Sequence, residues 1–174
     1  LDGGSGEDSL DGGGGDDVLT GGVGPDWDYL DGGEGNDVYL VEAGFGSDYI
    51  DLYTYANDEI NYVYITASVD PQTAIFSNVN GSLQIQFPDT GEMLELDGYF
   101  DLDSNGDFYG MSSPVVFATG SNPSVLTFEA IKVKVLEATE AGETINGFDT
   151  PDEIHGLGGD DTINGDNGND TLNG

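Results

Sequence analysis

The stretch GGSGEDSLDGGGGDDVLT, residues 3–20, holds two consecutive copies of one nine-residue pattern. Each copy has Gly at its first, second and fourth positions, Asp at its sixth and an apolar residue at its eighth. Glycine at these positions allows the positive backbone φ angles that a tight turn needs. The last three positions fit a very short strand, with the eighth side chain pointing inward. We therefore predict that each copy is a turn followed by a strand, and that two copies complete one coil.

The pattern recurs in two arrays, at residues 3–51 and 147–174. A further turn, around Glu143, is predicted to precede the second array. Leu1-Asp2 fits the end of an earlier copy and Gly174 the start of a later one, so we expect a longer parent chain with adjoining repeats or domains. The departures from the pattern are an insertion at Trp27-Asp28, Ala43 at a first position and Thr150 at a fourth.

The charge of the chain is strongly one-sided, because 35 acidic residues stand against two Lys and no Arg, for a net charge of -33. This balance argues against binding to nucleic acid or to an anionic membrane surface. No apolar run is long enough to span a bilayer, so direct membrane insertion is not expected. Since 36% of the residues are hydrophobic, disorder fits poorly. Several bound divalent cations would neutralise the acids and stabilise a compact fold.

The nine-residue period predicts which acids stack. Two copies per coil place acids 18 residues apart on the same side, which pairs Asp8 with Asp26, Asp152 with Asp170 and Glu143 with Asp161. Asp17 pairs with Asp37 across the insertion. Asp28 is an alternative to Asp26, and either is the partner of Asp48. The candidate calcium ligands are the sixth-position carboxylates and the turn carbonyls, namely Asp8, Asp17, Asp26, Asp28, Asp37, Asp48, Asp152, Asp161, Asp170, Gly13, Gly15, Gly22, Gly24, Gly33 and Gly35.

These nonapeptides resemble the RTX family, the haemolysin-type calcium-binding repeats of bacterial exoproteins. The resemblance implies a right-handed parallel β-roll, secretion through a type I channel as an unfolded chain, and folding on calcium outside the cell. The segment between the arrays resembles the spacer of adenylate cyclase-type toxins. The stretches behind that resemblance are GSLQIQF at 81–87, GEMLEL at 91–96, GYF at 98–100 and LTFE at 126–129.

The segment between the arrays, residues 52–146, is predicted to be an antiparallel β insert. Alternating apolar residues at 82–87, a turn at 88–91 and an extended pattern at 93–96 predict a β-hairpin. Weaker strands are expected at 60–66 and 115–118, and alternation of Ile131, Val133 and Val135 with two lysines predicts another. The fold class is thus all-β, with a parallel β-roll in two pieces, 1–51 and 147–174, flanking the insert.

One loop in the insert has ligand spacing of another kind. Asp101, Asp103, Asn105 and Asp107 occupy positions one, three, five and seven of a loop with Gly at six, as in the first half of an EF-hand calcium loop. Position 12 is Ser112 instead of the bidentate Glu. The loop is therefore predicted to be either an additional calcium site or a polar surface turn.

The functional prediction is a calcium-binding module, not an enzyme. The chain has no Cys or Arg, and its single His, His155, fits a solvated strand end. The resemblance implies a secreted, extracellular module of a toxin, adhesin or exoenzyme, with calcium driving its folding. The alternative is a calcium-scaffolded adhesin or carbohydrate-binding domain with a glycan or host receptor as partner. Trp27 and the tyrosines would then form a sugar-stacking surface, although core or cap positions are expected for them.

Overall fold

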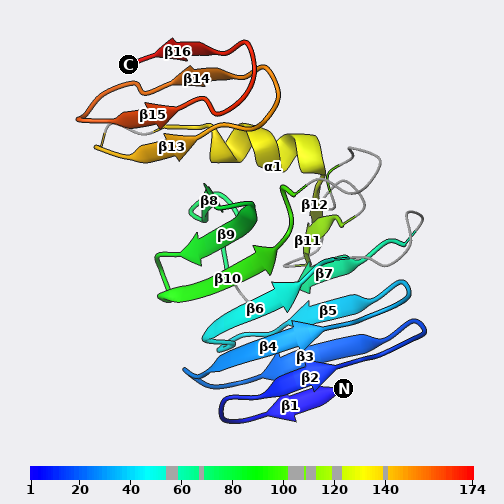
Figure 1. The fold of residues 1–174 in the computed structure, drawn as a ribbon. Coiled ribbons are helices and arrows are strands. Elements are labelled where there is room, and N and C mark those ends of the chain that lie inside the picture. Colours follow the sequence, from blue (N-terminus) through cyan, green and yellow to red (C-terminus); the bar gives the residue numbers. More distant parts are fainter. Residues whose placement is uncertain (54–58, 67–68, 102–107, 109–112, 119–122, 139–140) are drawn as a thin grey trace.

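The computed structural model describes residues 1–53, 59–66, 69–101, 108, 113–118, 123–138 and 141–174. From the N-terminus, successive strands alternate between two sheets, so that two strands make one coil of a solenoid (Figure 1). The first sheet contains, in spatial order, β1 (Asp2–Gly4), β3 (Val18–Gly22), β5 (Val38–Val41), β7 (Tyr62–Ile65), β11 (Val115–Phe117) and β12 (Ser124–Leu126). The second contains β2 (Ser9–Asp11), β4 (Trp27–Asp31), β6 (Ser47–Asp51), β10 (Glu92–Asp97), β9 (Ser82–Phe87) and β8 (Ile75–Val79).

The coils of the N-terminal repeats pair in parallel, which confirms the predicted β-roll. Asp2 is the register partner of Thr20, 18 residues further along the chain. Ser9 is the partner of Tyr29, 20 residues further along. The two extra residues lie in the turn before β4, so the insertion lengthens one turn and leaves the strands in phase.

The spacer continues both sheets of the roll. β7 pairs in parallel with β5, β11 with β7, and β10 with β6. The predicted hairpin is confirmed, because β9 and β10 pair in antiparallel across the turn at 88–91. β8 and β12 add antiparallel strands at the far edges of the two sheets. The spacer therefore combines parallel strands that extend the coils with antiparallel strands that end them.

The strand predicted at Ile131, Val133 and Val135 is wrong, since this segment forms the helix α1 (Phe128–Val135). The side chain of Thr127 accepts a hydrogen bond from the Ala130 backbone N–H at 3.4 Å and caps the helix. Phe128, Ile131 and Val135 are buried, whereas Val133 is 60% exposed, which is a helical and not an alternating pattern. No helix in the described part of the chain is long and apolar enough to cross a membrane.

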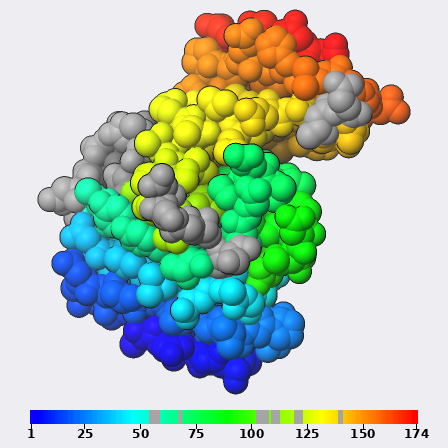
Figure 2. All heavy atoms as spheres, turned by 180° about the vertical axis from the view of Figure 1, so that it is seen from behind, coloured from blue at the N-terminus to red at the C-terminus, as the bar shows by residue number. Residues whose placement is uncertain are grey.

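The C-terminal repeats form a second, smaller roll. Its two parallel pairs are β13 (Thr144–Asn146) with β15 (Thr162–Asn164) and β14 (Glu153–His155) with β16 (Thr171–Asn173). Figure 2 shows α1, in yellow, between this roll and the body that contains the N-terminal repeats. The Asn78 side-chain amide donates to the Gly147 carbonyl at 3.2 Å, and the rings of Phe100 and Phe148 lie 4.8 Å apart. The second roll is thus packed on the spacer.

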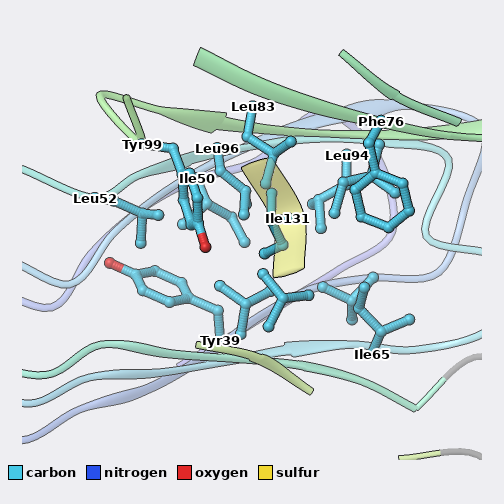
Figure 3. Close-up of a cluster of buried hydrophobic side chains, with 14 of the residues drawn as sticks. Tyr39, Ile50, Leu52, Ile65, Phe76, Leu83, Leu94, Leu96, Tyr99 and Ile131 are labelled. Atoms are coloured by element: carbon cyan, nitrogen blue, oxygen red, sulfur yellow. The ribbon is translucent and has the colours of Figure 1, made fainter. Parts of the chain in front are cut away.

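The core lies between the two sheets, where side chains from both meet (Figure 3). Each fully buried aliphatic side chain contributes about 1.5–3 kcal/mol. Tyr99 and Ile131 of the spacer pack into the same core. Most eighth-position side chains of the N-terminal repeats are fully or almost fully buried in this core, namely Leu19, Leu30, Tyr39 and Ile50. Leu10, in the first repeat, is half-buried.

Candidate metal sites

The sixth-position acids form two columns along the N-terminal roll, one beside each sheet. In the Asp17 column, the Asp17 backbone N–H donates to Asp37 Oδ1, and the Asp37 N–H donates to Asn61 Oδ1, both at 2.9 Å. The register of β7 and β11 places Ser113 next in this column. The predicted pair of Asp17 and Asp37 is therefore confirmed, and the column extends into the spacer with an amide and a hydroxyl.

In the Asp8 column, hydrogen bonds and strand register distinguish between Asp26 and Asp28 as the residue that follows Asp8. The Asp8 N–H donates to Asp28 Oδ1 at 2.9 Å, and Asp28 is the register partner of Asp48. The predicted pair of Asp8 with Asp26 is wrong, because the insertion carries Asp26 into the exposed part of the turn. Asp28 is instead 5% exposed. The next position in the column is Leu94, which is apolar.

The C-terminal roll repeats the same arrangement. The Asp152 N–H donates to Asp170 Oδ1, and the Glu143 N–H donates to Asp161 Oδ1, both at 3.1 Å. These two predicted pairs are confirmed. Asp152 Oδ2 also accepts from the Phe148 N–H at 2.6 Å.

Close contact between turn glycines and carboxylates explains the first glycine of the repeat. A Cβ atom placed on Gly12 would lie 2.8 Å from Asp17 Oδ2, and one placed on Gly165 would lie 2.6 Å from Asp170 Oδ2. A side chain at this position would therefore displace the carboxylate. One carboxylate oxygen thus holds the adjacent coil, while the other faces the turn of its own repeat.

The turns also stack directly on one another. The Glu34 N–H donates to the Gly13 carbonyl at 2.9 Å, and the Gly15 N–H donates to the Glu34 carbonyl at 2.7 Å. Gly33 has a φ of +84°, and a Cβ on it would collide with the Gly13 carbonyl. Turn carbonyls of adjacent coils are thereby held close to the carboxylates. The positive φ predicted for the turn glycines is found at Gly13, Gly15, Gly22, Gly33 and Gly35, but not at Gly24.

Among the residues that the structure describes, three buried carboxylate oxygens have no hydrogen-bond partner, namely Asp8 Oδ2, Asp37 Oδ2 and Asp48 Oδ1. Burial raises the pKa of Asp48 to about 7, and the charges of Asp28 and Glu92 act in the same direction. Burial also raises the pKa of Asp37 and Asp152. A buried carboxylate oxygen without a partner is costly, so Asp8, Asp37 and Asp48 fit a cation. Oxygen ligands alone suit a hard cation such as calcium.

Backbone carbonyls must supply much of any coordination shell. Within the described residues, no three His, Cys, Asp or Glu side chains are grouped so that they could hold one ion. Calcium takes six to eight oxygen ligands. The columns offer carboxylates in pairs and stacked turn carbonyls beside them, which is a suitable donor set.

Several other predicted positions have different outcomes. Asp103, Asn105 and Asp107 lie outside the described residues. Asp101 is described, and its Oδ2 accepts from the Tyr53 hydroxyl at 2.5 Å. His155 is exposed at the end of β14, as expected. Asn61 and Ser113 were not predicted, although the order Asn61-Tyr62-Val63 repeats the acid-x-apolar order of positions six to eight.

A comparison with protein families matches four copies of the RTX calcium-binding nonapeptide repeat, at residues 1–27, 26–50 and 144–174. The match does not include the central spacer, whose resemblance to toxin spacers stays a prediction. No curated protein matches the chain. The RTX repeat is a structural calcium-binding repeat and not a catalytic unit, and the described strands form a parallel β-solenoid that is consistent with a β-roll. Residues 1–50 and 144–174 of this chain are therefore RTX calcium-binding nonapeptide repeats.

Proposed function

We propose that this calcium-binding module folds when it meets calcium outside a bacterial cell, as part of a larger secreted toxin, adhesin or exoenzyme. The observation that carries the proposal is the set of buried, unpartnered carboxylate oxygens of Asp8, Asp37 and Asp48. With 35 acidic residues in the chain, these carboxylates repel one another unless cations neutralise them.

The coupling between calcium and folding follows from the columns. Each pair of stacked acids, such as Asp17 and Asp37, belongs to two turns that are distant in the unfolded chain. Bound calcium supplies the positive charge that lets both turns close. The site does not exist before the coil forms, so the free energy of binding becomes free energy of folding. We expect dissociation constants on the order of 10⁻⁴–10⁻³ M, the range of extracellular calcium modules.

The proposal assigns different roles to the repeats and to the spacer. Residues 1–51 and 147–174 bind calcium, and residues 52–146 join and cap the two rolls. No residue acts as a catalyst, and any enzymatic activity belongs to another part of the parent protein. Secretion proceeds through a type I channel, in which the calcium-free chain stays unfolded.

Circular dichroism during a calcium titration tests the proposal. We expect the β signal to grow with calcium up to millimolar concentration and to fall on adding a chelator. Magnesium at the same concentration is the control, because it demands a smaller octahedral shell and keeps its water. Identical β spectra in chelator and in calcium would rule out calcium-driven folding.

A second candidate function is glycan binding on the outer face of β4 and β6. Trp27 is 43% exposed, which departs from the core or cap position expected for it. Its ring lies 5.8 Å from that of Tyr49, which stacks on Tyr29 at 5.5 Å. Exposed aromatic rings favour sugar contacts. A glycan array with calcium present, repeated with Trp27→Ala, tests this candidate, and a hit that needs Trp27 would support it.

A further inference from the structure

The spacer segment Glu59 to Tyr62 imitates the junction between an RTX turn and its strand. In the repeats, the Val38 N–H donates to the Asp17 carbonyl at 2.9 Å, and the Asp17 N–H donates to Asp37 Oδ1. One coil later, the Tyr62 N–H donates to the Asp37 carbonyl at 2.8 Å, and the Asp37 N–H donates to Asn61 Oδ1. Asn61 thus takes the place of a sixth-position Asp in a segment that does not match the repeat family.

Glu59 extends the imitation to the turn itself. Between repeats, the Gly15 N–H donates to the backbone carbonyl of Glu34 at 2.7 Å. One coil later, the Gly35 N–H donates to Glu59 Oε1 at 2.9 Å. A side-chain carboxylate therefore stands where a repeat has a turn carbonyl. The Ile60 N–H donates to Asn36 Oδ1 at 2.9 Å and fixes the segment on the same turn.

An independent observation points to a ligand between these residues. Asp37 is 0% exposed, and its Oδ2 has no hydrogen-bond partner. This oxygen contacts the position where a Cβ of Gly32 would lie, so it faces its own turn. The negative charges of Asp17 and Glu59 also act on the Asp37 carboxylate. A buried carboxylate oxygen without a partner, with a second carboxylate held on the same turn, favours a bound cation.

We propose that Glu59 and Asn61 complete a calcium site with Asp37 and the carbonyls of turn 32–36, beyond the last nonapeptide of the Asp17 column. The inference rests on the proposed function, because it assumes that the columns bind calcium. Two carboxylates balance the charge of one dication, and an amide oxygen adds a neutral ligand. The next position in the column is Ser113, which brings no charge, so the ions of this column end here.

Calcium binding to the whole chain, measured by isothermal titration calorimetry with Glu59→Gln, tests the site. Gln keeps an oxygen for the Gly35 N–H but removes the charge, so the turn is preserved. We expect one site to be lost or weakened by about tenfold or more, with the others unchanged. The matched control is Glu95→Gln on β10, where Glu95 accepts from the Gln84 side chain at 2.9 Å outside both columns. This control should leave every site unchanged.

Asn61→Asp gives the opposite prediction. It adds a third carboxylate of nearly the same shape, so calcium affinity at this site should rise by about tenfold, while the calcium-free chain becomes less stable. If Glu59→Gln and Asn61→Asp both bind calcium as the unaltered chain does, the site is rejected and the proposed function stands. If the unaltered chain binds no calcium, the proposed function itself fails.

Discussion

The N-terminal and C-terminal repeats share one pattern but are buried to different degrees. At the eighth position, Leu19, Leu30 and Ile50 of the N-terminal array are 0% exposed. In the C-terminal array burial falls towards the end, from Ile154 at 0% to Leu172 at 46% exposed. The N-terminal coils continue into the strands of the spacer, while each sheet of the C-terminal roll has two strands. A solenoid coil is stabilised by its neighbours. The repeat pattern therefore determines the shape of a coil, and the adjacent coils determine its stability.

Calcium removal should give the largest difference between the two arrays. In a chelator, we expect residues 144–174 to lose more protection from amide hydrogen exchange than residues 1–50, because each sheet of the C-terminal roll has only two strands among the described residues. β4, β6, β9 and β10 should keep partial protection through the core of the spacer. Mass spectrometry of exchange with and without calcium measures both arrays in one sample. Equal loss in both arrays would show that the spacer does not support the N-terminal coils.

Truncation of the eighth-position side chain should lower the free energy of unfolding by different amounts in the two arrays. Leu30→Ala leaves a cavity in the core and should lower the free energy of unfolding by about 2–5 kcal/mol. Leu172→Ala at the same repeat position should change it by on the order of 0.5 kcal/mol. Urea denaturation in saturating calcium gives both values. A large effect at Leu172 would mean that its side chain is covered in solution.

The pH dependence of the calcium-free chain should identify the buried acid of the Asp8 column. The pKa of Asp48 is about 7 when folded, against 3.8 for an ordinary Asp, so the folded state holds a proton more tightly. The resulting stability is complete below about pH 4 and is lost as the pH rises towards 7. Thermal unfolding of the structure that remains around β4 and β6 in chelator, at several pH values, measures it. Asp48→Asn should flatten this dependence, and an unchanged slope would assign it to other groups.

Loss of the helix cap should have a small and local effect. Thr127→Ala removes the acceptor for the Ala130 N–H and should cost about 1 kcal/mol in helix α1. Since α1 lies against the C-terminal roll, exchange should rise in residues 144–174 and not in residues 1–50. Thr127→Ser keeps the hydroxyl and serves as the control. An equal rise in the N-terminal repeats would show that the helix supports the whole molecule.

The repeats were predictable because their period and their chemistry agree. Turn glycines, sixth-position acids and inward apolar residues all give the same phase, and this phase alone pairs Asp152 with Asp170. The insertion at Trp27-Asp28 breaks the agreement, since both Asp26 and Asp28 then fit. Only the register of β4 with β2 shows that the turn absorbs the extra residues and that Asp28 follows Asp8.

The spacer was less predictable because its local patterns are ambiguous. Ile131 and Val135 suit both an alternating strand and a helical face, and the decision comes from Thr127 and from packing against the core. Asn61 escaped prediction because a motif defined by Asp does not include an amide. Its place in the column depends on a coil of 24 residues, and the nine-residue repeat does not predict a coil of that length.

The placement of the two lysines affects how calcium binding depends on ionic strength. Lys132 lies 4.7 Å from the centre of the Phe148 ring, and Lys134 lies 5.0 Å from that of Phe76, so both are held against aromatic rings at the base of the C-terminal roll. The chain has no other Lys or Arg. The rest of the surface therefore attracts a diffuse atmosphere of cations in which calcium competes with monovalent ions. Added sodium chloride screens this attraction. We therefore expect the calcium affinity of the module to depend on the salt concentration as well as on calcium itself.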